Sequence, residues 1–251
     1  MEDIALDVHK RYTWARVENA PGERVLEQRV LHQRGAIQAF VPQWTAGSPV
    51  AVETVGNWYW VVDEIEAGRG QPQLVNARVA KRMMGSVNKS DRLDVQGLTR
   101  LQRTGTLPTV WILSGAVRDA RELPRTRMVF SQQRTPLKNR VLAPLAKYGL
   151  LVADVSDAFG VRGRQQIAGL VPQLPPQTQQ AVTALLGQLD HVLATLTLLE
   201  RHMRAVFAPC PQTAWLKTLS GVGDLLAIVI WTEIGTLARF HRAEALASYS
   251  G

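Results

Sequence analysis

Two short apolar runs in this chain each end in a carboxylate. Asp7 closes the run in MEDIALDVHK, and Glu53 closes the run in SPVAVETVGNW, where a turn follows. An unpaired charge beside buried apolar residues is costly, so both acids need a compensating environment. A third acidic feature, Asp91 and Asp94 in SVNKSDRLDVQGLTRL, is spaced so that both carboxylates share one helix face. Two strand ends and one helix face can converge at a single point of an α/β sheet.

Converging carboxylates suit a divalent cation, because hard cations take oxygen ligands and keep part of their water. We therefore predict that Asp7, Glu53, Asp91 and Asp94 are catalytic and bind Mg²⁺, with Mn²⁺ as an alternative. The competing interpretation is structural, since most of the 21 acidic residues of such a chain are solvated or cap helices. The interrupted apolar runs, and the Lys and Arg residues around the Asp pair, favour a metal-binding or nucleic-acid-processing site.

The distribution of charge points to a polyanionic partner. Residues 1–68 carry 6 Lys and Arg against 10 Asp and Glu, residues 69–147 carry 16 against 4, and residues 148–251 carry 7 against 7. The whole net charge of +8 therefore originates in the middle of the chain. A basic block of this kind is typical of nucleic-acid binding, which should weaken steeply with salt.

Composition limits the remaining classes of protein. With 251 residues and 46% hydrophobic content, the chain can form one large domain or two smaller ones and is not disordered. The single cysteine, Cys210, excludes a disulfide framework. The N-terminus lacks a signal pattern, and the longest apolar run, residues 225–231, is too short to cross a bilayer. We expect a cytoplasmic protein with no membrane partner.

The first half of the chain has the element order of ribonuclease H. The segments IALDV, TWARVEN and RVLEQRVL alternate as strands of an antiparallel meander. A helix in RGAIQAFVPQW leads to the strand VAVET, then to the helix NWYWVVDEIEAG and the strand QPQLVN. This order places Asp7 on the first strand of a mixed sheet and Glu53 on the fourth. Ser90 is expected to cap the helix that carries the Asp pair.

The second half is predicted to be helical. Residues 115–148 are rich in arginine, and we expect Pro124, Pro136 and Pro144 to kink or break this stretch. Residues 175–207 form a long Leu-rich helix, which could be a coiled-coil arm. After residue 209, the turn LSGVG between two helices resembles a helix-hairpin-helix, whose glycines allow close approach to a phosphate. The predicted nucleic-acid contacts are Lys10, Lys89, Arg118, Arg121, Arg125, Arg127, Arg134, Lys138, Arg140, Gly221 and Gly223.

Two further features have open interpretations. His9 follows Asp7 by two positions and could assist the acidic site, although a histidine there is more often a surface or hydrogen-bonding residue. Trp58, Tyr59 and Trp60 could stack on bases. Aromatic residues on a helix beside a sheet are more often core, and we expect this of at least one of the three.

Several long segments resemble the DEDD-type insertion-sequence transposases, the family that includes the bridge-RNA-guided recombinases. They are LDVHK, VETVGNWYWVVDEIE, LVNARVAKRMMGSVNKSDRLDVQGL, RTGTLPTVW, RELPRTRMVFSQQRTPLKNRV and, near the C-terminus, GVGDLLAIVIWTEIGTLARF with LASYSG. The resemblance implies a Holliday-junction-resolvase-like (RuvC-like) ribonuclease H domain at 1–112 with an acidic tetrad at Asp7, Glu53, Asp91 and Asp94. It also implies a basic helical or coiled-coil arm at 113–208 and part of a mostly α C-terminal transposase domain at 209–251.

The family also implies partners and a second catalytic group. The partners are DNA, a guide (bridge) noncoding RNA and further copies of the chain in a dimer or tetramer. The second catalytic group is a serine nucleophile in a Ser-Gly motif. Because the context of Ser250 matches an earlier glycine turn of the family pattern, we expect this serine beyond residue 251. The expected activity is transposition of an insertion sequence by DNA recombination in a bacterial cell, at the nucleoid. The alternatives are a structure-selective nuclease that activates water and a non-catalytic remnant that binds RNA or DNA.

Overall fold

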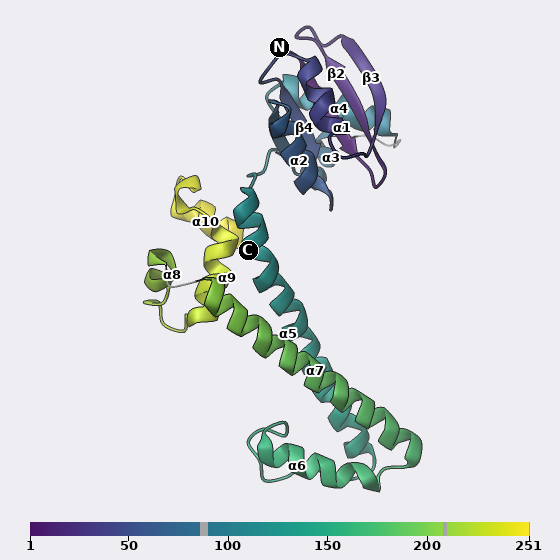
Figure 1. Ribbon diagram of the computed structural model, residues 1–251, viewed down its shortest axis with the longest axis vertical. Coiled ribbons are helices and arrows are strands. Elements are labelled where there is room, and N and C mark those ends of the chain that lie inside the picture. The colour runs from purple at the N-terminus through teal and green to yellow at the C-terminus, as the bar shows by residue number, and fades with distance from the viewer. Residues whose placement is uncertain (86–89, 208–209, 251) are drawn as a thin grey trace. The chain divides into compact units, whose positions relative to one another are not determined.

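The chain forms two compact units, Met1–Leu113 and Ser114–Gly251 (Figure 1). The structure, a computed structural model, describes residues 1–85, 90–207 and 210–250. The first unit contains a sheet with helices, and within its described residues the second unit contains helices alone. The predicted further division near residue 208 remains a prediction.

A five-stranded mixed sheet is the centre of the first unit. Strands β1 (Asp3–Val8), β2 (Tyr12–Glu18) and β3 (Arg24–Leu31) form the antiparallel meander that the sequence predicts. Strand β4 (Pro49–Glu53) pairs parallel to β1, and β5 (Gln71–Val75) pairs parallel to β4. The resulting order β3-β2-β1-β4-β5 fits a ribonuclease H-like fold.

Helices cover both faces of this sheet. They are α1 (Ala36–Phe40), the 3₁₀ turn η1 (Val41–Gln43), α2 (Trp58–Ala67), α3 (Ala77–Met84) and α4 (Asp91–Arg103). Because side chains alternate along a strand, Ile4 and Leu6 lie on one face of the sheet and Ala5 lies on the other. Ile4 and Leu6 pack in one core with residues of α1 and α2, whereas Ala5 packs with Val95 and Leu98 of α4.

The second unit is built on two long helices that lie side by side, α5 (Gly115–Lys147) and α7 (Pro176–Val206) (Figure 1). Between them in sequence come α6 (Val161–Leu170) and the turn η2 (Val171–Gln173). Val141, Ile167 and Val182 are fully or almost fully buried in a core shared by α5, α6 and α7. The last elements are α8 (Pro211–Leu216), α9 (Asp224–Ile234), the turn η3 (Leu237–Arg239) and α10 (Ala243–Ser250). A coiled-coil geometry for the α5–α7 pair remains a prediction.

Helix α5 continues through its three prolines. Pro124, Pro136 and Pro144 all lie inside one helix of 33 residues, so the prolines do not break this stretch. The alternative that the sequence allowed, a kink at these positions, remains a prediction. Each proline removes one backbone hydrogen bond. Packing of α5 against α7 and α9 holds the helix together across these interruptions, and such tertiary contacts routinely override local propensity.

Among the described helices, α7 alone has the length and composition of a membrane-crossing segment. An 18-residue window in it has a mean hydropathy of 1.4, and 22% of that window is buried. Val182, Leu189 and Val192 on this helix are fully buried against neighbouring elements. A helix that packs within a water-soluble fold passes the same test, so the composition of α7 assigns no membrane.

Candidate metal centre

The two strand acids lie next to each other at the carboxyl end of the sheet. In the parallel pairing of β1 with β4, Leu6 is opposite Val52. Asp7 and Glu53 directly follow these two residues, so the strands deliver both carboxylates to one edge. Asp7 and Glu53 also share the strand face of Ala5 and Ala51, which is the face covered by α4.

The first turn of α4 brings the second pair of acids to the same place. Ser90 caps this helix, because its side chain accepts a hydrogen bond of 3.3 Å from the Leu93 N–H, and this confirms the predicted cap. Asp91 and Asp94 both lie in the first turn, where the helix dipole favours negative charge. Val95, one residue beyond Asp94, packs on the sheet and fixes this end of α4 above the strands.

Electrostatic interactions couple the carboxylates at this edge of the sheet. Burial raises the pKa of Asp7, and the negative charges of Asp91 and Asp94 raise it further, whereas His9 opposes the shift. Burial likewise raises the pKa of Glu53, with further upward contributions from Asp7 and Asp94. Of the four acids that the sequence singles out, Asp7 and Asp91 have ligand atoms within 4.8 Å of each other, whereas Glu53 and Asp94 are connected to Asp7 through these charge effects.

His9 and Tyr12 complete the cluster. His9 Nε2 lies 3.0 Å from Asp7 Oδ2 and 3.2 Å from Asp91 Oδ2, so the imidazole links the strand end to the helix start. The Tyr12 hydroxyl donates a hydrogen bond of 2.9 Å to Asp91 Oδ2, and its ring lies 4.6 Å from that of His9. Ligand atoms of Asp7, His9 and Asp91 all lie within 4.8 Å of one another.

These residues fit a divalent cation. Carboxylate oxygens dominate the cluster, as Mg²⁺ requires, while the imidazole nitrogen of His9 also suits Mn²⁺. The positive charge of Lys81 on α3 lowers the pKa of Glu53. Sequence reasoning missed Tyr12 and Lys81 and gave His9 little weight. The one available signal was the period-2 spacing of Asp7 and His9.

The predicted nucleic-acid contacts separate into three groups. Lys10, Arg134 and Arg140 are exposed. Arg125 pairs with Glu233, Arg127 with Glu200 and Lys138 with Asp157. Arg118 and Arg121 are buried, at 5% and 4% exposure, so in this conformation they are not part of an exposed contact surface. Lys89 lies outside the described residues.

Arg121 contacts the C-terminal end of α9, which its position in the basic stretch does not predict. Its Nε donates to the carbonyl of Thr232 at 2.7 Å, and its guanidinium also donates to the carbonyl of Glu233. Both carbonyls belong to the last turn of α9, where backbone oxygens lack helical partners. Arg121 therefore caps α9 from α5 within the second unit.

The glycine turn before α9 has the geometry of a tight connection. Gly221 has a φ of +84°, which favours glycine, and Gly223 is the N-cap residue of α9. The turn joins α8 to α9, as predicted, and its contact with a phosphate remains a prediction. Ser250, the serine at the end of α10, donates its hydroxyl to the carbonyl of Ala247 at 2.8 Å.

Comparisons with known proteins agree with this arrangement. A family model for the DEDD transposase of IS110 elements matches residues 4–149, which is more than half of the chain. A second model, described as the transposase IS116/IS110/IS902 family, matches residues 213–251. The first match contains all four carboxylates of the cluster.

A curated relative supports the same grouping. The transposase for insertion sequence element IS1111A of Coxiella burnetii (strain RSA 493 / Nine Mile phase I) is 25% identical over 185 residues. The match covers 73% of this chain and 50% of the relative, so the chain spans about half the length of that protein. Together with the ribonuclease H-like sheet and its acidic edge, the family models show that the chain belongs to the IS110 family of transposases.

Proposed function

We propose that the first unit cleaves DNA phosphodiesters during transposition of an insertion sequence, with Mg²⁺ bound by Asp7, Glu53, Asp91 and Asp94. The observation that carries this proposal is the convergence of four carboxylates from two strand ends and one helix start. Burial and mutual repulsion raise the pKa of both Asp7 and Glu53. A bound cation relieves that repulsion, so the arrangement is better explained by cation binding than by a contribution to folding.

The residues of the chain have distinct roles in this proposal. When bound, the cation polarises a phosphoryl oxygen and orients the scissile phosphodiester. Asp7 and Glu53 hold their carboxylates on rigid strands, and Asp91 is fixed by the Tyr12 hydroxyl. Since the ligands must be ionised and burial raises the pKa of both Asp7 and Glu53, protons compete with the cation for these carboxylates, and binding should strengthen with pH.

The composite reaction of the family is part of the same proposal. A serine from the C-terminal transposase domain would attack phosphorus, displace the DNA 3′ oxygen and leave a covalent serine–phosphate bond to DNA. A guide RNA and further copies of the chain would complete the assembly. The net charge of +12 in residues 69–147 supports a nucleic-acid partner.

A metal-dependent nuclease is the second candidate, because all four acids lie within the first unit. In that reaction a water molecule replaces the serine as nucleophile. The product distinguishes the two: transposition chemistry gives a protein–DNA adduct that survives denaturing electrophoresis, whereas the nuclease gives free DNA ends. Formation of neither product, with metal and DNA both bound, would favour a binding-only role.

Calorimetric titration with Mn²⁺ tests the metal centre directly. Asp91→Asn and Asp94→Asn should each bind Mn²⁺ at least about tenfold more weakly than the unsubstituted protein, since each loses an anionic oxygen ligand. Glu66→Gln is the matched control, because Glu66 is an exposed acid on α2 of the same unit. Equal affinities in all four proteins would remove the basis for the proposed function.

A further inference from the structure

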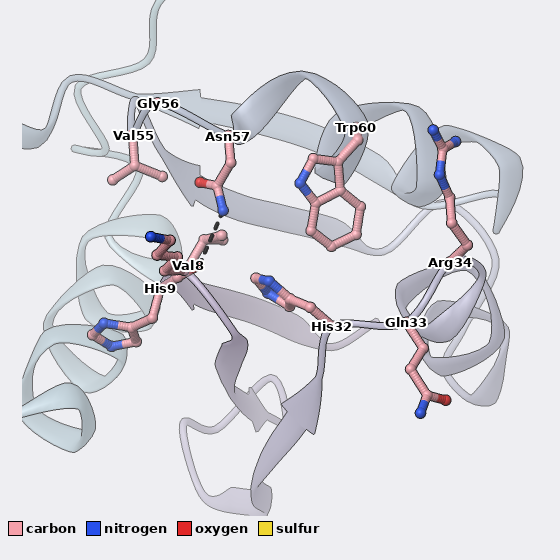
Figure 2. A pocket seen from close by; sticks show the side chains of 10 residues that line it. Val8, His9, His32, Gln33, Arg34, Val55, Gly56, Asn57 and Trp60 are labelled. Atoms are coloured by element: carbon pink, nitrogen blue, oxygen red, sulfur yellow. Dashed lines mark hydrogen bonds between the residues drawn. The ribbon is translucent and has the colours of Figure 1, made fainter.

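A cavity of about 670 Å³ lies beside the acidic cluster, at the carboxyl end of the sheet (Figure 2). It is formed by the end of β1 and by the segments that follow β3 and β4. Its volume falls in the range of pockets that hold a small organic ligand or a nucleotide unit. The proposed function accounts for the acids themselves but leaves this neighbouring cavity without an occupant.

The cavity is cationic. Of its ten lining residues none is acidic, whereas Lys10, Arg34, His9 and His32 are basic. Lys10 and Arg34 are exposed, and neither makes an ion pair with any residue that the structure describes. These two cations stand out because residues 1–68 are acidic overall. Two uncompensated cations at the mouth of a cavity are suited to a phosphate.

The cavity also has an aromatic wall, formed by Trp60 and His32. Figure 2 shows the indole of Trp60 and the imidazole of His32 directed toward each other, and their ring centres are 4.8 Å apart at 82°. Trp60 packs partly against the sheet core through α2, and His32 Nε2 lies 2.8 Å from the Thr13 hydroxyl. Both rings are therefore held in place, and rigid aromatic surfaces of this kind bind nucleobases.

His9 joins the cavity to the acids. It lines the cavity, and its Nε2 lies within 3.2 Å of carboxylate oxygens of Asp7 and Asp91. The Asn57 side chain donates a hydrogen bond of 3.0 Å to the His9 carbonyl, shown as a dashed line in Figure 2, and fixes this boundary. A DNA strand with its phosphate at the acids would place the adjoining nucleotide in the cavity.

We propose that this cavity holds an unpaired nucleotide of the DNA strand next to the phosphodiester that the acids position. Lys10 and Arg34 contact the phosphates that flank this nucleotide, and Trp60 with His32 contacts its base. The base must be unpaired, because a paired base within a duplex is covered by its stacked neighbours and cannot reach an aromatic wall. The inference rests on the proposed function and adds a requirement for locally opened DNA.

Binding to two DNA probes tests this assignment. One probe is a blunt duplex, and the other is the same duplex with a short single-stranded overhang, both with Ca²⁺ in place of Mg²⁺ to prevent cleavage. The unsubstituted protein should prefer the overhang. Arg34→Gln and Trp60→Leu should each weaken overhang binding about fivefold or more, with little effect on the blunt duplex. Trp60→Phe should retain most of the preference, because an aromatic face remains.

Arg69→Gln is the matched control for charge. Arg69 is exposed and precedes β5, so it lies at the opposite end of the parallel strands from Glu53. Thermal unfolding of each variant separates lost binding from lost folding, which matters for Trp60 because it contacts the core. Arg34 lies at the surface, so Arg34→Gln keeps the test valid even if Trp60→Leu is unstable.

The outcomes separate this inference from the proposed function. If Arg34→Gln, and Trp60→Leu where it folds, bind both DNA probes as Arg69→Gln does, the cavity assignment is overturned and the metal centre is unaffected. If an RNA overhang gains as much affinity as the DNA overhang, the assignment to DNA is wrong. If the protein binds none of these probes and Mn²⁺ binding is independent of Asp91, the proposed function fails as well.

Discussion

His9 Nε2 lies 3.0 Å from Asp7 Oδ2, one strand period further along the chain. The same nitrogen lies 3.2 Å from Asp91 Oδ2, so one imidazole connects two acids that are far apart in sequence. It opposes the rise in the pKa of Asp7 that burial and the neighbouring acids cause. His9 therefore offsets part of the repulsion within the carboxylate cluster and helps to hold its geometry.

Asp7→Asn should stabilise the metal-free protein at neutral pH. Because the folded-state pKa of Asp7 lies above its ordinary value of 3.8, the folded protein binds this proton more tightly than the unfolded chain. The contribution of Asp7 to the free energy of unfolding is thus least favourable above its raised pKa and becomes more favourable as pH falls through that pKa. Removal of the charge should raise the free energy of unfolding by roughly 0.5–2 kcal/mol at pH 7, the range for an optimised charge.

Urea unfolding from pH 4 to 8 without divalent cations measures this effect. The gain from Asp7→Asn should be largest at neutral pH and should shrink as the solution becomes acidic. Added Mn²⁺ should reverse the order: at 100 times its dissociation constant a ligand stabilises by about 2.7 kcal/mol, and Asp7→Asn should lose most of that. Lower metal-free stability of the variant at pH 7 would contradict the prediction.

Glu64→Ala should loosen the segment that lines the cavity. The buried Glu64 carboxylate accepts hydrogen bonds from the backbone N–H groups of Gly35 and Ile37, at 2.7 and 3.0 Å, and so caps α1. Bonds to a charged acceptor contribute about 1.5–3 kcal/mol, so we expect a loss of roughly 2–3 kcal/mol.

Glu66→Ala is the control for this substitution. Glu66 is exposed on the same helix, and none of the described residues bonds to its side chain. Unfolding in urea should leave Glu66→Ala close to the unsubstituted protein, and hydrogen exchange should increase at residues 33–38 in Glu64→Ala alone. Equal losses in both variants would show that α2 itself, rather than the cap, is affected.

The sequence predicts the sheet because its strands alternate or run apolar between clear turns. It predicts the acidic cluster because a charge that interrupts a buried strand is costly and requires a compensating partner or ligand. Tyr12 and Lys81 are harder to predict, since they reach the cluster from β2 and α3. Their proximity depends on the β1–β2 register and on the placement of α3, neither of which a local pattern contains.

In the arginine-rich stretch of α5, the sequence predicts more exposed charge than the structure shows. Arg118 and Arg121 are buried although their charges suggest a surface. A helix of 33 residues that packs against two others presents its side chains to several environments, and composition cannot distinguish a capping arginine from an exposed one. The three prolines do not break α5 for a related reason, because contacts from α7 and α9 outweigh the bonds lost within the helix.

Two glycines of α6 should respond in opposite directions to substitution by alanine. A Cβ at Gly163 would collide with the backbone carbonyl of Ala158, whereas a Cβ at Gly169 would meet open space. Gly163→Ala should therefore cost about 1–3 kcal/mol through overpacking. Gly169→Ala should gain up to about 1 kcal/mol from higher helix propensity. Thermal unfolding of the two variants checks the pair, and a loss in both would show that α6 tolerates no added methyl group.

Arg134 and Arg140 should determine the salt dependence of nucleic-acid binding by the long helix. Both are exposed, and neither has an ion-pair partner among the residues that the structure describes. Each phosphate contact contributes about −0.9 to the slope of log affinity against log salt on duplex DNA. If each arginine contacts one phosphate, the double variant Arg134→Gln, Arg140→Gln should flatten that slope by about 1.8.

Arg121→Met provides the contrast for this prediction. It removes one positive charge from the same helix, but it leaves the carbonyl of Thr232 without its side-chain donor and the carbonyl of Glu233 with the Tyr249 hydroxyl alone. We expect a loss of stability of roughly 1–3 kcal/mol, the cost of unsatisfied buried groups, with an unchanged salt slope for the fraction that remains folded. If Arg121→Met flattens the slope of log affinity against log salt more than the Arg134→Gln, Arg140→Gln double variant does, α5 contacts nucleic acid through its packed face. Such a contact requires α9 to move away.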